Sequence, residues 1–326
     1  MSAPVDVAFP LWAWAVFVVL VAVLLFLDLF VLHRGAREVS FREALWLSGF
    51  WIAVSLAFGG FVWFVGGADP AGRYLTAYLV EKSLSVDNVF VFAVILSGFA
   101  VPEKHRYHVL FYGVIGALVF RLLFILAGSA LLQTFSWLVY VFGAFLVFTG
   151  ARMLFKGEGE EADPQDNRAF KLLRRFLPLT EDYKGDNFFV RMDGKRYATP
   201  LLAALVVIEA SDVIFAVDSV PAVLSLTQTP FVAYSAMAFA VLGLRALYFA
   251  LEGLTDRFVY LHYGLAAILI FLGVEFVLQG FGVHLPIYVS LAVIATVVTT
   301  SIVASLHATR KGGSDGDDGS PEKEET

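Results

Sequence analysis

Apolar runs of about twenty residues follow one another along most of the chain, and they restrict its fold more than any other feature. An α-helix rises about 1.5 Å per residue, so each run is long enough to cross roughly 30 Å of hydrocarbon. The composition agrees, because 59% of the 326 residues are hydrophobic and 16% are charged, whereas roughly 25% are charged in an average soluble domain. The sequence therefore predicts an all-α, polytopic membrane protein.

Charged or turn-rich breaks divide the apolar runs into nine predicted spans. They lie near residues 10–32, 43–65, 73–99, 106–127, 134–155, 199–225, 231–251, 258–279 and 284–306. Lys and Arg accumulate in alternate connections, and positively charged connections stay in the cytoplasm. This pattern predicts a plasma (inner) membrane protein with its N-terminus outside and its C-terminus in the cytoplasm, which requires an odd number of spans.

Outside the spans, the sequence divides into a transmembrane domain over 1–308, with a long cytoplasmic loop at 156–198, and an acidic tail at 309–326. We expect the tail to be disordered because its acids stand among Gly and Ser. In the loop, Asp193-Gly194 favours a β-hairpin, since both central residues of such a turn need a positive φ. The alternative is a linker whose apolar residues only touch the membrane face.

Two stretches of the chain carry the same order of unusual residues at nearly equal spacings. Each has a membrane carboxylate, an arginine one span later and a glycine in the third span. These residues are Asp87, Arg121 and Gly150 in the first stretch and Asp212, Arg245 and Gly273 in the second. The pattern predicts an inverted repeat of two three-helix units, near 73–155 and 199–279, because an odd number of spans turns the second unit upside down.

Carboxylates are concentrated in the third and sixth predicted spans, although an acid at the centre of a span costs about 2.5 to 3.5 kcal/mol on insertion scales. In the third span, Glu81, Ser85 and Asn88 share one helical face, and Asp87 lies to one side of it. The result is a stack of oxygen atoms, which suits a cation site.

The sixth span has a similar arrangement, because Asp212 shares one face with Glu209 and with Ser219. Asp218 points elsewhere on an ideal helix. Pro221 removes a backbone donor, and we expect the helix to bend or open beside Asp218 and to free carbonyl oxygens as ligands.

These five membrane acids outnumber the membrane cations Lys82, Arg121 and Arg245, which leaves about two negative charges, the amount that a divalent cation supplies. The alternative is a network of salt bridges that only holds helices together. The chain has no cysteine, and its candidate ligands are oxygens, which suit Mn²⁺, Mg²⁺ or Ca²⁺ better than Zn²⁺ or Cu⁺.

Two further acids are weaker candidates. Asp28, at the inner end of the first span, is either a sixth metal ligand or an interfacial partner of Arg34. Glu275, toward the outer end of the eighth span, is either a vestibule acid or simply exposed. The chain lacks the P-loop, Gly-x-Ser-x-Gly and His-Glu-x-x-His patterns, so we expect no enzyme activity and no resident cofactor.

Three motifs of this chain resemble those of a known family. They are the segment from Glu81 to Phe92, the segments Gly185 to Arg191 and Thr199 to Leu201, and the segment from Ile208 to Ala222. They resemble the TerC/Alx integral membrane proteins, which are associated with tellurite resistance and manganese export, and Asp28 to Arg34 is similar to the family's first span. The resemblance implies a helical transporter with Mn²⁺ as substrate.

Taken together, the residues and the resemblance predict a manganese exporter, driven by proton antiport, in which Glu81, Asp87, Asp212 and Asp218 converge on one metal site. A net-anionic pore is a poor path for an oxyanion such as tellurite. The competing hypothesis is a membrane scaffold or assembly protein in tellurite or envelope stress, which binds partner proteins through the 156–198 loop and the tail. Neither hypothesis needs a nucleic-acid partner.

Overall fold

The computed structural model describes residues 9–29, 40–155, 168–176, 178–180, 185, 187–192, 195–251 and 260–312. Its elements are α1 (Leu11–Leu27), α2 (Phe41–Gly66), α3 (Ala68–Gly98), α4 (Glu103–Thr134), α5 (Leu138–Phe155), α6 (Arg168–Phe176), β1 (Phe189–Met192), β2 (Lys195–Ala198), α7 (Pro200–Leu226), α8 (Pro230–Leu242), α9 (Leu244–Leu251), α10 (Leu261–Gly280) and α11 (Ile287–Gly312). A helix therefore lies in each range predicted to span the membrane, and the range near 231–251 holds two, which are separated at Gly243.

Seven helical segments of the described chain are long and apolar enough to cross a membrane. They are α2, α4, α5, α7, α10, α11 and the pair α8 and α9 taken together. The other two predicted spans differ for physical reasons. Helix α1 has 17 residues, and α3 carries Glu81, Lys82 and Asp87 close together, which lowers its hydropathy. The mostly helical membrane architecture is confirmed, and nine spans remain a prediction.

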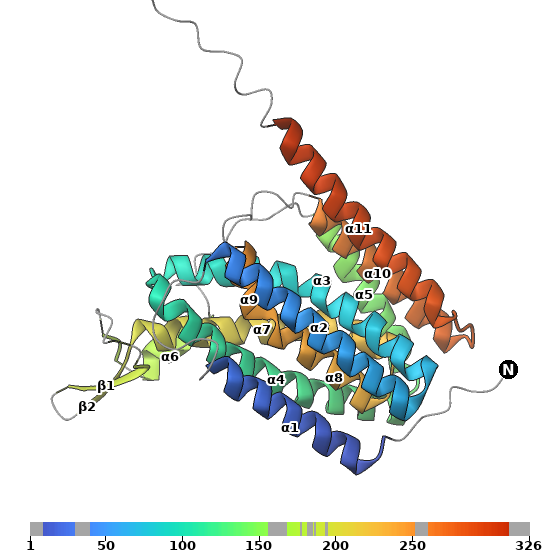
Figure 1. The fold of residues 1–326 in the computed structure, drawn as a ribbon, viewed down its shortest axis with the longest axis horizontal. Coiled ribbons are helices and arrows are strands. Elements are labelled where there is room, and N and C mark those ends of the chain that lie inside the picture. Colours follow the sequence, from blue (N-terminus) through green and yellow to red (C-terminus); the bar gives the residue numbers. More distant parts are fainter. Residues whose placement is uncertain are drawn as a thin grey trace, which may run out of the picture.

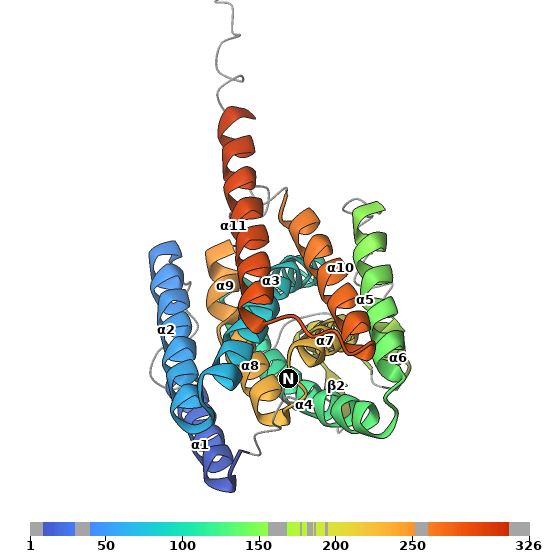
Figure 2. The ribbon, with the colours of Figure 1, turned by 90° about the vertical axis from the view of Figure 1, so that its right-hand side faces the viewer.

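Helix α8 lies inside the bundle, since 89% of the segment that it forms with α9 is buried. Figure 2 shows α2 and α5 on opposite sides of the bundle, with α7 and α8 between them. Helix α1 covers α8 through aromatic rings, with Trp14 5.1 Å from Phe231 and Phe17 5.5 Å from Tyr234 between ring centroids. Helix α11 extends beyond the rest of the bundle (Figures 1 and 2).

The two predicted three-helix units pack against each other along their full set of helices. Helix α3 packs against α7 and α8, α4 packs against α7 and α8, and α5 packs against α10. The α5–α10 contact needs glycine, because a Cβ at Gly273 would lie 2.6 Å from the Gly143 oxygen and one at Gly150 would lie 2.7 Å from the Ala266 oxygen. Small residues allow this close backbone approach between membrane helices.

Helix α7, which carries the sixth-span acids, is fixed at its C-terminal end by two neighbours. The carbonyl oxygen of Leu226 accepts a hydrogen bond from Arg73 of α3 at 2.7 Å, and that of Ser225 accepts one from Gln279 of α10 at 2.8 Å. Both carbonyls lie in the last turn, where no intrahelical donor is available. These two bonds therefore connect the end of α7 to both units.

The expected opening of α7 at Pro221 is not present, because the helix runs without interruption from Pro200 to Leu226. The proline ring removes one backbone donor, but its fixed φ is compatible with a helix, so one lost hydrogen bond need not break it. The interruption lies instead in the next predicted span, at Gly243 between α8 and α9.

The described part of the 156–198 loop is folded. Strands β1 and β2 pair antiparallel with Met192 opposite Lys195, so a β-hairpin is present where it was expected. Asp193 and Gly194, the predicted turn residues, lie outside the described residues. Figure 1 shows α6 and this hairpin at the end of the bundle where α7 begins. The Thr199 hydroxyl donates to the Asn187 carbonyl at 2.8 Å and fixes the loop to the start of α7. Helix α11 continues past residue 308 to Gly312, and most of the acidic tail lies outside the described chain.

Candidate functional site

A buried arginine of α4 joins the two helices that carry the predicted site acids. Arg121 Nη1 donates to Glu81 Oε1 of α3, and Arg121 Nη2 donates to Asp212 Oδ1 of α7 at 3.0 Å. Nη1 also lies 3.4 Å from the hydroxyl of Ser219, two turns further along α7. The structure therefore brings together Glu81, Asp212 and Ser219, which lie far apart in the sequence.

This cluster is closed to solvent within the described structure, with exposed fractions of 1% for Arg121, 0% for Glu81 and 1% for Asp212. Each of the three residues lies near the middle of its helix. The second oxygens, Glu81 Oε2 and Asp212 Oδ2, are buried and have no hydrogen-bond partner among the described residues. A buried carboxylate oxygen without a donor is costly, so each acid has one oxygen that Arg121 does not satisfy.

Glu209 approaches the same cluster from one turn earlier on α7. Its carboxylate lies against the backbone of α4 at Gly116, where a Cβ would overlap both carboxylate oxygens. Its Oε2 atom is buried and lacks a hydrogen-bond partner in the described part of the chain. Gly116 precedes Arg121 by five residues, or about 7.5 Å along the helix axis. The sequence predicted Glu209 as a site acid but gave no sign of the part played by Gly116.

The remaining predicted residues of α3 and α7 lie at different distances from this cluster. Asn88 is buried in α3, two turns beyond Glu81. Asp87 lies in α3, and its side chain is outside the described residues. Asp218 faces away toward α5, where its Oδ1 accepts from the Thr149 hydroxyl at 3.3 Å. The prediction that Asp218 shares one site with Glu81 therefore has no direct contact to support it, because six residues turn Asp218 off the face of Asp212.

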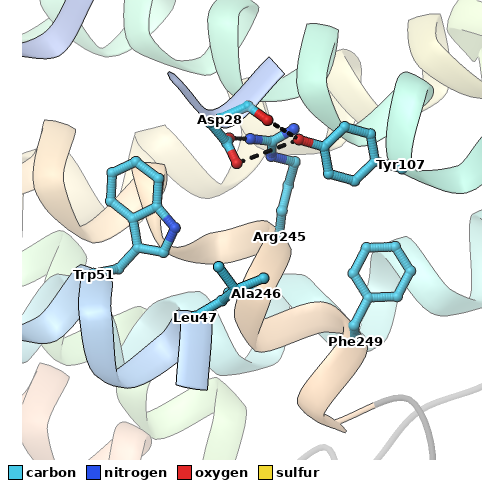
Figure 3. Close-up of a pocket in the computed structure, with 7 residues that line it drawn as sticks. All are labelled: Asp28, Leu47, Trp51, Tyr107, Arg245, Ala246 and Phe249. Atoms are coloured by element: carbon cyan, nitrogen blue, oxygen red, sulfur yellow. Dashed lines mark hydrogen bonds and ion pairs between the residues drawn. The ribbon is translucent and has the colours of Figure 1, made fainter. Parts of the chain in front are cut away.

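Asp28 belongs to a separate cluster in a small pocket between α1, α2, α4 and α9 (Figure 3). Its carboxylate pairs with Arg245, and its backbone oxygen accepts from the Tyr107 hydroxyl at 2.8 Å. The Arg245 guanidinium lies over the rings of Tyr107 and Phe111, at 4.4 and 4.9 Å from their centroids. Phe111 precedes Arg121 by ten residues, or about 15 Å along α4, so Asp28 does not contact the Arg121 cluster.

Glu275 is neither exposed nor part of an open vestibule. It is 4% exposed, and its two carboxylate oxygens lie 2.8 and 2.9 Å from the hydroxyl of Ser290 in α11. This contact connects α10 with α11. The apolar character of the surrounding α10 was the sequence signal that could have indicated burial.

The Arg121 cluster combines the carboxylates of Glu81 and Asp212 with one guanidinium, and Glu209 lies one turn from Asp212 on α7. The formal excess is one negative charge, or two when Glu209 is ionised. No three acidic or imidazole groups converge closely enough to hold a metal ion among the side chains that the structure describes. The guanidinium occupies the space between Glu81 and Asp212. In this arrangement a cation shared by Glu81 Oε1 and Asp212 Oδ1 would compete with Arg121 for the same place.

Comparison with known proteins agrees with this architecture. The chain matches the family described as "Integral membrane protein TerC family" over residues 66–313. An uncharacterized membrane protein of Myxococcus xanthus is 45% identical over 297 residues, which cover 91% of this chain and 92% of that protein. A protein of Escherichia coli K12, named as a candidate membrane-bound redox modulator, Alx, is 42% identical over 314 residues, covering 92% and 97% of the two chains.

A protein of Salmonella typhi with the same name is 44% identical over 299 residues, which cover 89% of this chain and 92% of that protein. No solved structure matches the chain. The matched range contains α3, α4 and α7, the three helices that hold the Arg121 cluster. The resemblance seen in the sequence motifs is thus confirmed, and the chain belongs to the TerC family of integral membrane proteins.

Proposed function

We propose that this protein exports a divalent metal cation, with Mn²⁺ as the favoured cargo. The observation that carries the proposal is the pair of buried carboxylates, Glu81 of α3 and Asp212 of α7, each with one oxygen lacking a partner in the described structure. Membrane helices rarely bury acids unless they neutralise them or use them on an ion path. The metal is cargo in this proposal, so the chain needs no resident cofactor and catalyses no chemical conversion.

The chemistry of the donors supports a hard cation. The cluster offers carboxylate and hydroxyl oxygens, and the chain has no cysteine to supply a thiolate. Oxygen ligands suit Mn²⁺, Mg²⁺ and Ca²⁺, whereas thiolates favour zinc and copper(I). When Glu209 is ionised, the two excess negative charges match one divalent ion, and the oxygen donors place Mn²⁺ ahead of the softer metals.

We also propose that two units of three spans each form an inverted repeat. The first unit is α3, α4 and α5, and the second is α7, the pair α8 and α9, and α10. Gly150 of α5 faces Ala266 of α10, and Gly273 of α10 faces Gly143 of α5. If the repeat makes Gly150 equivalent to Gly273, the same sequence offset makes Gly143 equivalent to Ala266. The Gly150–Ala266 contact and the Gly273–Gly143 contact then join the same two positions of the repeat. Reciprocal contacts of this kind are typical of a two-fold interface. Such an interface is where repeat transporters bind their cargo.

Within this proposal the protein spans the inner membrane nine times, with its N-terminus outside, as the alternation of basic connections favours. Export is coupled to proton entry, because carboxylates that release a metal ion can take up protons in its place. Exchange of two protons for one divalent ion is electroneutral and is the simplest form.

The name of the Alx relatives assigns them redox modulation, and a metal exporter accommodates such an effect. This chain has no cysteine, so its own side chains cannot carry out thiol–disulfide exchange. A change in the cellular content of a redox-active metal is a route that its residues leave available. The scaffold hypothesis draws on the folded α6 and hairpin at one end of the bundle, and it requires no change in metal content.

The proposal is tested by the metal content of cells that express the protein and cells that lack it. We expect expression to lower total manganese and to raise tolerance of added manganese. The Asp212→Asn variant should lose both effects, and Asp69→Asn is the matched control, because Asp69 is 62% exposed and pairs with Arg73 on the same helix. Unchanged manganese in cells with correctly inserted protein would favour the scaffold hypothesis.

A further inference from the structure

Arg121 lies between carboxylates of two different helices, whereas a simple structural salt bridge needs only one of them. Its two terminal nitrogens donate to carboxylates on two different helices, Glu81 of α3 and Asp212 of α7. Each of those carboxylates keeps a second buried oxygen with no hydrogen-bond partner among described residues. The guanidinium thus occupies the point where the two helices present opposed acids to each other.

A divalent cation bound by Glu81 and Asp212 needs that same point. Metal–oxygen bonds of the hard divalent ions are between about 2.0 and 2.6 Å long, so such an ion would sit between the two carboxylates. A guanidinium stays charged in proteins and cannot leave the site by losing its proton. The repulsion between two like charges in a buried site prevents both cations from staying there. Metal binding therefore requires Arg121 to move.

A destination for the displaced guanidinium lies on the N-terminal side of Arg121. The carboxylate of Glu209 rests on the α4 backbone at Gly116, and its Oε2 atom is buried without a hydrogen-bond partner in the described chain. Gly116 is about 7.5 Å before Arg121 along the axis, and helical side chains lean toward the N-terminus. Glu209 precedes Asp212 by three residues, or about 4.5 Å along α7, so the guanidinium has to shift by roughly one turn of α7 to reach it.

We propose that Arg121 is an internal substitute for the transported cation. It holds Glu81 and Asp212 together when no metal is bound, and it moves to Glu209 when a divalent cation takes its place. This inference rests on the proposed export function and adds how Glu81 and Asp212 keep a positive partner when no metal is bound. The carrier can then return across its cycle without cargo, because Glu81 and Asp212 always have a positive partner, either Arg121 or the metal ion.

The test measures Mn²⁺ binding to purified protein in lipid nanodiscs, from the electron paramagnetic resonance signal of free aquated Mn²⁺. In Arg121→Gln the metal no longer competes with a guanidinium, so its dissociation constant should fall by about tenfold or more. Arg121→Lys should give a smaller fall, since one ammonium cannot donate to both carboxylates in the same fork geometry. Arg42→Gln, at an exposed position of α2, should leave binding unchanged.

A second variant identifies the destination. Glu209→Gln removes the acceptor of the displaced guanidinium, so it should weaken Mn²⁺ binding when Arg121 is present and leave it unchanged in the Arg121→Gln background. A direct ligand would weaken binding in both backgrounds, and that outcome would overturn the assignment of Glu209. If Arg121→Gln does not fold, Arg121→Met supplies the uncharged background for the same comparison.

The internal-cation role of Arg121 and the export function can be tested independently of each other. Wild-type protein that binds Mn²⁺, together with an Arg121→Gln variant that binds it equally or more weakly, overturns the internal-cation role and leaves metal export standing. Absence of Mn²⁺ binding in the wild type and in every variant overturns both.

Discussion

The close glycine contact between α5 and α10 gives a quantitative prediction about the architecture of the bundle. A Cβ added at Gly273 of α10 would lie 2.6 Å from the oxygen of Gly143 and 2.8 Å from the nitrogen of Val147, both on α5. Ordinary van der Waals contacts of a Cβ begin at 3.4 Å, so Gly273→Ala must move the helices apart by about 0.8 Å. A gap of that size forfeits a quarter to a half of the local dispersion energy.

We therefore expect Gly273→Ala to lower the free energy of unfolding by about 1 to 3 kcal/mol, the usual cost of overpacking, or roughly a 5- to 150-fold change in the unfolding equilibrium. The assay is thermal or denaturant unfolding of purified protein in detergent. Gly60→Ala is the control, since no atom lies within 4 Å of a Cβ at Gly60 on the exposed side of α2. Alanine there should be neutral or stabilising by about 0.5 to 1 kcal/mol.

The inverted repeat adds a second expectation to this prediction. Gly150→Ala should destabilise the protein by a similar amount, because its Cβ would lie 2.7 Å from the Ala266 oxygen and 3.0 Å from the Ile270 nitrogen. If Gly273→Ala is as stable as Gly60→Ala, the described packing of α5 on α10 is wrong. If Gly273→Ala is destabilising and Gly150→Ala is not, the packing stands and the equivalence of the two units fails.

Three further predictions concern other parts of the molecule. Mn²⁺ movement into proteoliposomes should follow an imposed proton gradient and stop when an ionophore collapses it, and transport that ignores the gradient would rule out proton antiport. Asp28→Asn should destabilise the protein by about 3 to 5 kcal/mol in thermal unfolding, because it leaves Arg245 buried without its anion; an unchanged midpoint would contradict the described pairing. Arg73→Ala removes the donor to the Leu226 carbonyl, so hydrogen exchange should rise at the C-terminal turn of α7, and equal protection in both proteins would exclude that bond.

The sequence was sufficient to locate the helices and to select two acids, Glu81 and Asp212, that the structure places in one buried cluster. Hydropathy finds the membrane segments because the cost of placing charge in hydrocarbon acts on each segment by itself. Glu81 and Asp212 could be selected for the same reason, since each is a charged residue in an otherwise apolar run. The hairpin turn was also local information, because Asp-Gly specifies its own backbone conformation.

The arrangement around the site depended on tertiary packing, which the sequence pattern does not contain. Helical periodicity gives the angle between Asp212 and Asp218 but not which neighbour each one faces, and the structure turns Asp218 toward Thr149 of α5. Arg121 was predicted only as a neutralising charge, because its role as a bridge depends on how α4 lies between α3 and α7. The close approach of Glu209 to Gly116 depends on the same packing.

The central claim, that buried carboxylates of α3 and α7 carry a divalent cation through the membrane, is tested most directly by Mn²⁺ transport in proteoliposomes. Asp212→Asn and Glu81→Gln each remove one charge while keeping size and hydrogen-bonding capacity, and Asp69→Asn makes the same change at an exposed carboxylate. We predict that both site variants insert and fold but lose transport, whereas wild type and Asp69→Asn move Mn²⁺ at equal rates. Transport by both site variants at the wild-type rate would contradict the account.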